Sequence, residues 1–263
     1  MLTSLVTLFI TLLPAANAAD SPTLKFVSTP IPTLVSNSTD EARLQSIIAR
    51  AFSHSDVEAE FTIARRAFVG SGLISGKYDG HFAMAGFDEQ SDKFLYSAPI
   101  IQLNLFLVSK DTKAATISSF ADLEDARVGI LNRHAFNPLI RSYSGVKWSR
   151  NPTLADLFKQ LGDKRTDFGL LDKLTIDELN LLLSAQHQEL LTLSPVPLVR
   201  SSYVLSINRA TPGAAQLLER FNKAITEMRA SGEIDKILDT VDGHTNRSSL
   251  LNPSQYQRTL NRW

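Results

Sequence analysis

Short apolar segments alternate with amphipathic segments along most of the chain. Apolar runs at residues 24–28, 127–131 and 168–171 have the length of buried strands. Between such runs, apolar residues recur at helical spacing, most clearly at Ala214, Leu217, Leu218, Phe221, Ile225 and Met228. Because the predicted strands are short and nearly all apolar, helices are expected to cover both faces of mainly parallel sheets. The pattern therefore predicts an α/β fold.

Local signals mark where several helices begin. Ser38 and Glu41 have capping-box spacing, and Thr153 and Thr175 each precede a helical stripe. The dipeptide at 211–212 is Thr-Pro, and proline favours the first position of a helix. We therefore expect helices to start at or directly after these residues.

The first residues have the pattern of an export signal. An apolar run at 2–13 is followed by Pro14 and by the small-x-small sequence Ala-Asn-Ala at 16–18. The run is too short to span a bilayer as a helix. We predict a signal peptide over residues 1–18 and a mature protein in the periplasm. With 0 cysteines, the mature chain cannot be anchored as a lipoprotein through a cysteine.

Composition removes several classes of function. The chain has 27 Lys+Arg against 27 Asp+Glu, so its net charge is +0 and no basic surface for nucleic acid is expected. The absence of cysteine excludes disulfides, thiol nucleophiles and Cys-ligated metals. The five histidines are scattered, and the apparent phosphate loop fails at Ser71 and Tyr78. We therefore expect no enzyme, no metal and no cofactor.

Several segments, in order along the chain, resemble those of the family 3 extracellular solute-binding proteins, the periplasmic amino-acid-binding type. They are GLISGKYDG at 72–80, DEQSDKFLYSAP at 88–99, FADL at 120–123, RVGI at 127–130, RTDFGLLD at 165–172, FNKAI at 221–225 and SGEIDKI at 231–237. Each match is short, but together they cover nearly the whole predicted mature chain.

The resemblance implies the two-lobe type II periplasmic binding fold, in which each lobe is a mainly parallel sheet flanked by helices. Lobe one is then expected over residues 19–101 and 203–263, and lobe two over 104–200. Two crossing segments near 101–103 and 200–203 would form a two-strand hinge, and a ligand would bind in the cleft between the lobes. We expect the protein to be a monomer.

The resemblance also assigns residues to the ligand site. Gly86 and Gln90 fall in the stretch where most relatives carry an arginine that binds the ligand carboxylate, and Gln90 replaces that arginine. The loop at 29–33 lacks the aromatic residue that usually stacks on the ligand. An ordinary α-amino-acid pose is therefore not expected to carry over unchanged.

Further candidates lie in both lobes. Arg66 matches a position that often faces the cleft, and Asn132, Arg133, His134 and Ala135 match a ligand loop at the head of a helix. Alternatives remain for each: Arg66 as a solvated helix residue, Asn132 as a helix cap, and Arg133 with His134 as surface residues.

Asp172 matches the carboxylate that receives the ligand's amino group in the family. The same carboxylate could instead cap the helix that follows it. Both roles use its oxygen atoms as acceptors, and the sequence leaves the choice open.

The first function that these observations predict is a periplasmic protein that binds a small polar ligand, amino-acid-like or a related small anion, for a membrane transporter or sensor. Two alternatives remain open. One is a dehydratase-like enzyme on the same scaffold, with Asp172 and His134 as candidate acid–base groups. The other is a degenerate binding fold that acts as a protein-interaction or sensory partner.

Overall fold

The computed structural model describes residues 23–31, 34–37, 42–85 and 91–239. The predicted signal peptide at 1–18, the capping residues Ser38 and Glu41, and the site candidates Gly86 and Gln90 lie outside the described residues. No described helix is both long and apolar enough to cross a membrane.

The described strands form one ten-stranded mixed sheet in the order β2-β1-β3-β10-β5-β8-β6-β7, with β4 paired to β10 and β9 paired to β5. The strands are β1 (Thr23–Ser28), β2 (Glu58–Ile63), β3 (Gly80–Met84), β4 (Phe94–Tyr96), β5 (Ile101–Ser109), β6 (Arg127–Leu131), β7 (Lys147–Asn151), β8 (Phe168–Asp172), β9 (Thr192–Leu193) and β10 (Val199–Asn208).

Seven α-helices flank the sheet. They are α1 (Arg43–Ser53), α2 (Arg66–Ile74), α3 (Pro138–Ser142), α4 (Leu154–Gly162), α5 (Lys173–Ala185), α6 (Ala214–Ala230) and α7 (Glu233–Asp239) among the described residues. Two short 3-10 helices, η2 (Thr112–Thr116) and η3 (Phe120–Leu123), follow β5.

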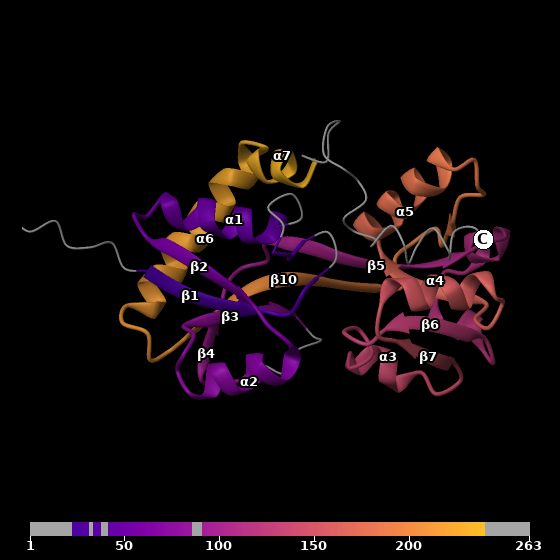
Figure 1. The fold of residues 1–263 in the computed structure, drawn as a ribbon, viewed down its shortest axis with the longest axis horizontal. Helices are drawn as coiled ribbons and strands as arrows, with labels where there is room; N and C mark the ends of the chain where they lie inside the picture. Colours follow the sequence, from indigo (N-terminus) through magenta and orange to yellow (C-terminus); the bar gives the residue numbers. More distant parts are fainter. Residues whose placement is uncertain (1–22, 32–33, 38–41, 86–90, 240–263) are drawn as a thin grey trace, which may run out of the picture.

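The elements gather in two groups that β5 and β10 connect (Figure 1). We call the group of β1–β4, α1, α2, α6 and α7 lobe one, and the group of β6–β9 and α3–α5 lobe two. Within the groups, β1 runs parallel to β2 and β3, and β6 runs parallel to β7 and β8. The predicted α/β two-lobe fold is confirmed, and the antiparallel pairs all involve β5 or β10 within the named strands.

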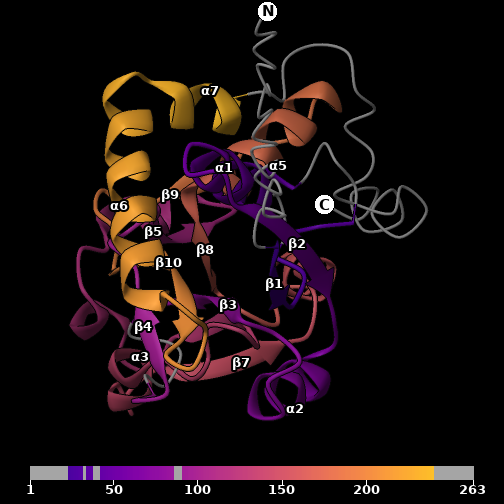
Figure 2. The ribbon, with the colours of Figure 1, turned by 90° about the vertical axis from the view of Figure 1, so that its left-hand side faces the viewer.

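Aromatic side chains fill the core of each lobe. In lobe one, the ring of Phe52 lies between Phe26 at 5.6 Å and Phe221 at 5.0 Å, which joins α1 and α6 to the sheet. Figure 2 shows α6 along one edge of the molecule, with α1 beside its upper part. In lobe two, Trp148 packs edge-on against Phe120 at 5.7 Å. Trp148 is therefore part of the packing of lobe two.

Two predicted helix starts are displaced. The helix expected at Thr175 begins at Lys173, because Asp172 takes the N-cap position and accepts a hydrogen bond from the Thr175 backbone N–H. The helix expected at Pro212 begins at Ala214, and Gly213 provides its N-cap with a left-handed φ of 69°. The predicted cap at Thr153 is confirmed by its side-chain bond to Asp156 N–H at 3.1 Å.

Gly80 allows β3 to lie against β10. A Cβ at this position would collide with the backbone oxygen of Ser206. We predict that Gly80→Ala lowers the free energy of unfolding by about 1–3 kcal/mol, since the backbone of β10 must move. Urea unfolding followed by circular dichroism measures the change. Gly70→Ala is the matched control: it lies in α2, a Cβ there meets nothing within 4 Å, and its stability should stay equal or rise. Equal stability of both variants would contradict the prediction.

Candidate ligand-binding site

A cavity of about 280 Å³ lies where lobe one faces the loop after β6 of lobe two. We call it the arginine cavity. It is lined by Ser28, Thr29, Ile31, Arg66, Val69, Gly70, Leu73, His81, Phe82, Met84 and Arg133. The lobe-one residues come from α2, from β3 and from the carboxyl end of β1. Ligands commonly bind at the carboxyl edge of such a parallel sheet.

The charged groups in this wall are cationic. Arg66 and Arg133 both line the cavity, and no acidic side chain is among its described lining residues. One wall is apolar, with Val69, Leu73 and Phe82. A cavity of this size with a few polar groups on an apolar wall suits a small molecule, and the guanidinium groups favour one with a negative charge.

Arg133 is held by two neighbours in lobe two. Its Nε donates to Nε2 of His134 at 2.9 Å, and its Nη2 lies 3.4 Å from Oδ2 of Asp172. Because Nε2 of His134 accepts this bond, the ring is the neutral tautomer with its proton on Nδ1. Burial, and secondarily the Arg133 charge, lower the pKa of His134 well below its usual range. His134 therefore acts as a neutral acceptor that orients Arg133.

Both oxygens of Asp172 are already engaged. Oδ1 accepts from the Thr175 backbone N–H at 3.0 Å, and Oδ2 accepts from the Thr175 hydroxyl at 2.8 Å as well as from Arg133. The residue is 7% exposed. The capping role that the sequence left open is thus present, and the carboxylate does not line the arginine cavity.

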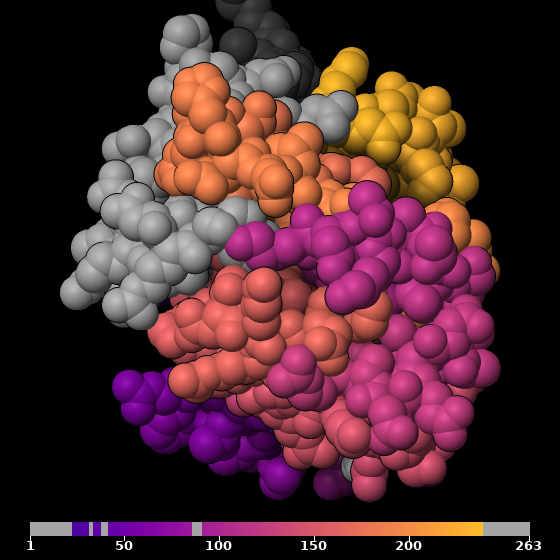
Figure 3. All heavy atoms as spheres, turned by 90° about the vertical axis from the view of Figure 1, so that its right-hand side faces the viewer, coloured from indigo at the N-terminus to yellow at the C-terminus, as the bar shows by residue number. Residues whose placement is uncertain are grey.

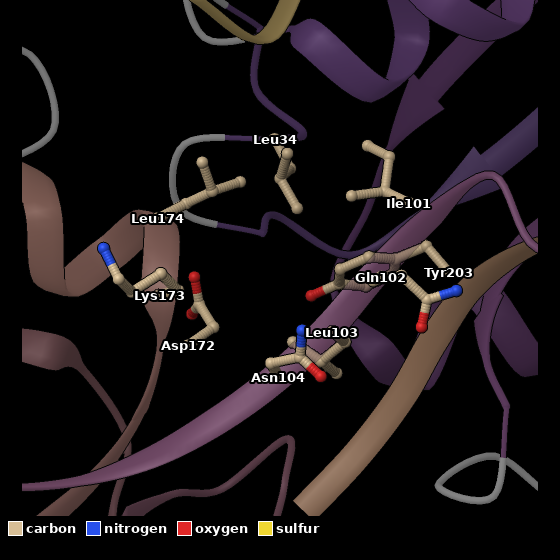
Figure 4. A pocket seen from close by; sticks show the side chains of 9 residues that line it. All are labelled: Leu34, Ile101, Gln102, Leu103, Asn104, Asp172, Lys173, Leu174 and Tyr203. Carbon is tan, nitrogen blue, oxygen red and sulfur yellow. The ribbon is translucent and has the colours of Figure 1, made fainter. Parts of the chain in front are cut away.

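Asp172 instead lines a smaller hollow of about 40 Å³ beside the crossing strands, the hinge crevice. Figure 4 shows its carboxylate facing this space, with Gln102 and Asn104 of β5 across from it. The other lining residues are Leu34, Ile101, Leu103, Lys173, Leu174 and Tyr203. A hollow of this size has room for water but not for a solute of amino-acid size.

A cation–π stack joins the lobes at the arginine cavity. Arg66, the first residue of α2, places its guanidinium carbon 4.9 Å from the ring centre of Phe136 in lobe two. Arg150 of β7 lies 5.8 Å from the same ring. The Arg66 and Arg150 distances are both within the range of a cation–π interaction, which favours this arrangement of the lobes.

Seen from the lobe-two end, purple atoms of lobe one extend beyond the lower edge of lobe two (Figure 3).

A buried ion pair joins the lobes a second time. Nη1 of Arg43, at the start of α1, lies 3.1 Å from Oε1 of Glu178 in α5. The side chains are 6% and 14% exposed. A pair so far removed from water interacts strongly, but its formation also requires both charges to be desolvated.

The structure brings some of the predicted site residues together. Arg66 and Arg133 line one cavity, and Asp172 and His134 support Arg133 from behind. Asn132 is exposed and Ala135 is buried, and neither lines the arginine cavity.

The predicted helix head at 132–135 is wrong. The helix α3 begins at Pro138, and Asn137 caps it by accepting from the Leu139 and Ile140 N–H groups at 2.9 and 3.2 Å. Residues 132–136 form turns, in which the N–H groups of Asn132, His134 and Ala135 donate to backbone carbonyls. These three N–H groups are therefore not available to an anion.

Sequence reasoning missed Ser28, His81, Phe136 and the Arg43–Glu178 pair. Ser28 had a usable signal, because it ends a predicted strand where a ligand would be expected. Phe136 and the ion pair had none, since each contact joins positions far apart in sequence.

A comparison with family models matches residues 45–241 to the bacterial extracellular solute-binding proteins, family 3. The chain belongs to this family, whose members bind small ligands outside the cytoplasm and deliver them to ABC transporters. No curated protein sequence matches the chain.

Solved structures share its fold. An amino acid ABC transporter substrate-binding protein, AbpA from Streptococcus pneumoniae bound to L-arginine, has a TM-score of 0.61 and 18% identity over 83% of this chain and 93% of that one. An arginine 3rd transport system periplasmic binding protein from Legionella pneumophila has a TM-score of 0.59 and 17% identity, over 84% and 99%. The ancestral amino acid-binding protein AncCDT-1, described as a precursor of cyclohexadienyl dehydratase, has 0.58 and 18%, over 83% and 94%.

Stability should fall in mild acid through His134. Its pKa is depressed in the folded protein but is close to 6.5 when the chain is unfolded, so protons favour the unfolded state below about pH 6.5. The slope should approach about 1.4 kcal/mol per pH unit. Urea unfolding between pH 7.5 and 5.0 measures it. His134→Gln should lose this part of the dependence, whereas the exposed His54→Gln should keep it; an unchanged slope in His134→Gln would refute the assignment.

The Arg43–Glu178 pair should be much more sensitive to loss of one partner than of both. Arg43→Met leaves a buried carboxylate without its counter-charge and should destabilise the protein by about 3 kcal/mol. The double variant Arg43→Met/Glu178→Leu should recover most of that loss. Lys223→Met, in an exposed pair, is the control and should have little effect. Thermal or urea unfolding measures all three, and equal loss in the single and double variants would contradict the prediction.

Proposed function

We propose that this protein is a periplasmic solute-binding protein that captures a small polar ligand, amino-acid-like or a related small anion, in the arginine cavity. It then presents the ligand to a membrane transporter. The observation that carries the proposal is that Arg66 of lobe one and Arg133 of lobe two line the same cavity. A ligand that contacts both stabilises the arrangement in which the lobes approach each other.

The proposed hinge is the pair β5 and β10. Their register joins Leu103 to Ser201 and Ile101 to Tyr203, which lie within the segments predicted to cross between the lobes. Two strands suit a hinge, because a few backbone dihedral angles can absorb the motion. We accordingly propose lobe boundaries at residues 101 and 203 for lobe one, and at 104 and 200 for lobe two.

The two alternative functions receive less support. A dehydratase would need an acid–base pair facing its substrate, but neither Asp172 nor His134 lines the arginine cavity. A degenerate fold would fill its cleft with its own side chains, whereas about 280 Å³ remains open. The solute-binding function therefore fits the described residues best.

A broad ligand panel tests the proposal. A panel of amino acids, organic acids, sugars and short peptides should contain compounds that raise the melting temperature of the purified protein, since a bound ligand stabilises the folded state. Native mass spectrometry should detect the same compounds bound, and small-angle scattering should show a more compact particle with them. Absence of any shift or bound species across the panel would contradict solute binding.

Arg66 should contribute directly to affinity. Arg66→Gln removes a charged donor from the cavity and should weaken binding of the best panel ligand about 10- to 100-fold, corresponding to a charge-assisted hydrogen bond. Isothermal titration calorimetry measures the change. Arg65→Gln is the matched control, because Arg65 precedes α2 and is not among the residues that line the cavity. An equal loss in both variants would mean that Arg66 does not contact the ligand.

A further inference from the structure

Building on the proposed solute-binding function, we infer that the ligand is a small organic monocarboxylate without an ammonium group, rather than an α-amino acid. The juxtaposition that carries this inference is Arg133 between Asp172 and the arginine cavity. The guanidinium of Arg133 is paired with the carboxylate of Asp172, which a ligand amino group would otherwise need as its acceptor.

Most acceptor sites of Asp172 are taken by groups of the protein, and its carboxylate does not line the arginine cavity. Its two oxygens accept from the backbone N–H and hydroxyl of Thr175 and from Nη2 of Arg133, and it faces the hinge crevice instead of the arginine cavity. An ammonium group that bound Oδ2 from the side of the arginine cavity would have to displace Arg133 from a buried carboxylate. It would also have to displace Arg133 from His134, because the same guanidinium donates to His134 at 2.9 Å.

The charge balance of the wall favours a single negative charge. Arg133 and Asp172 neutralise each other, and Arg66 has no carboxylate partner within the described part of the chain. Of the two arginines in the described lining, only Arg66 therefore keeps an uncompensated positive charge. A monocarboxylate balances this charge, whereas a zwitterion would add a second cation beside two guanidinium groups with no anionic acceptor in the described wall.

The remaining wall indicates what the carboxylate is attached to. Val69, Leu73, Phe82 and Met84 give the cavity an apolar side. Ser28 and His81 add polar groups, with the Ser28 hydroxyl donating to Thr29 O at 2.9 Å and the His81 ring bonded to Ser206. A 2-oxo or 2-hydroxy acid with a short alkyl or branched chain is complementary to this lining. Its alkyl chain would contact the apolar side, and its oxo or hydroxy group would face the polar groups.

Matched pairs of ligands test the inference on the unmodified mature protein. Each pair shares a carbon skeleton and a carboxylate and differs at C2: 4-methyl-2-oxopentanoate with L-leucine, 3-methyl-2-oxobutanoate with L-valine, and phenylpyruvate with L-phenylalanine. Melting-temperature shifts and calorimetry should rank the oxo acid above its amino acid by at least tenfold in affinity in at least one pair.

The outcomes separate the inference from the function on which it rests. If the amino acids bind as tightly as the oxo acids or more tightly, the inference is overturned and solute binding stands. If no oxo acid or hydroxy acid binds while a sugar or peptide of the broad panel does, the inference is again overturned alone. If nothing in either set binds, both fail.

A variant tests the role of Arg133 itself. Arg133→Gln frees Asp172 and should shift the ratio of oxo-acid to amino-acid affinity toward the amino acid by at least tenfold. Arg141→Gln makes the same charge change in α3, away from the lining residues, and should leave the ratio unchanged. Should Arg133→Gln fail to fold, Arg133→Lys retains the charge and should retain the preference. A ratio that is unchanged in folded Arg133→Gln would overturn the assignment.

Discussion

The antiparallel pairing of β5 with β10 is the constraint on which the rest of the structure depends. Residues 199–203 of β10 pair with β5, while 203–207 continue into lobe one against β3. In the same way β5 continues from this pairing into lobe two, where 105–108 pair with β8. The two lobes therefore share two continuous strands, β5 and β10, and meet elsewhere through side chains. Any cavity between them has a wall from each lobe, and its shape depends on the angle at these two strands.

Arg133 shows how one side chain can change the chemistry that a fold offers. It lies in the turn after β6 and lines the arginine cavity, and the neutral imidazole of His134 and the carboxylate of Asp172 hold its guanidinium. Asp172 is in turn fixed by the first turn of α5 through Thr175. The helix cap, the ion pair and the cavity wall are thus one hydrogen-bonded unit, in which each member limits what the others can bind.

Much of this could be predicted from the sequence, and the reason is that it depends on local patterns. The apolar run at 127–131 and the stripe of α6 predict their elements because periodicity reports burial directly. The failures have a common cause, which is that the decisive contact lies elsewhere in the chain. The head of the helix after β6 was misplaced because residues 132–136 form turns first, and Asn137 then caps α3. The Arg66–Phe136 stack and the Arg43–Glu178 pair join residues from different lobes, and no spacing in the sequence encodes them.

These interlobe contacts also affect how strongly any ligand binds. Both require the lobes to lie as they do here, so they favour this arrangement before a ligand enters, whereas the desolvation of Arg43 and Glu178 opposes it. The apparent affinity of a two-state receptor is its intrinsic affinity multiplied by the fraction of molecules already in the binding arrangement. A protein whose lobes are held by an ion pair and a cation–π stack needs less binding energy from the ligand to close. A small monocarboxylate with few contacts is the kind of ligand for which that saving matters most.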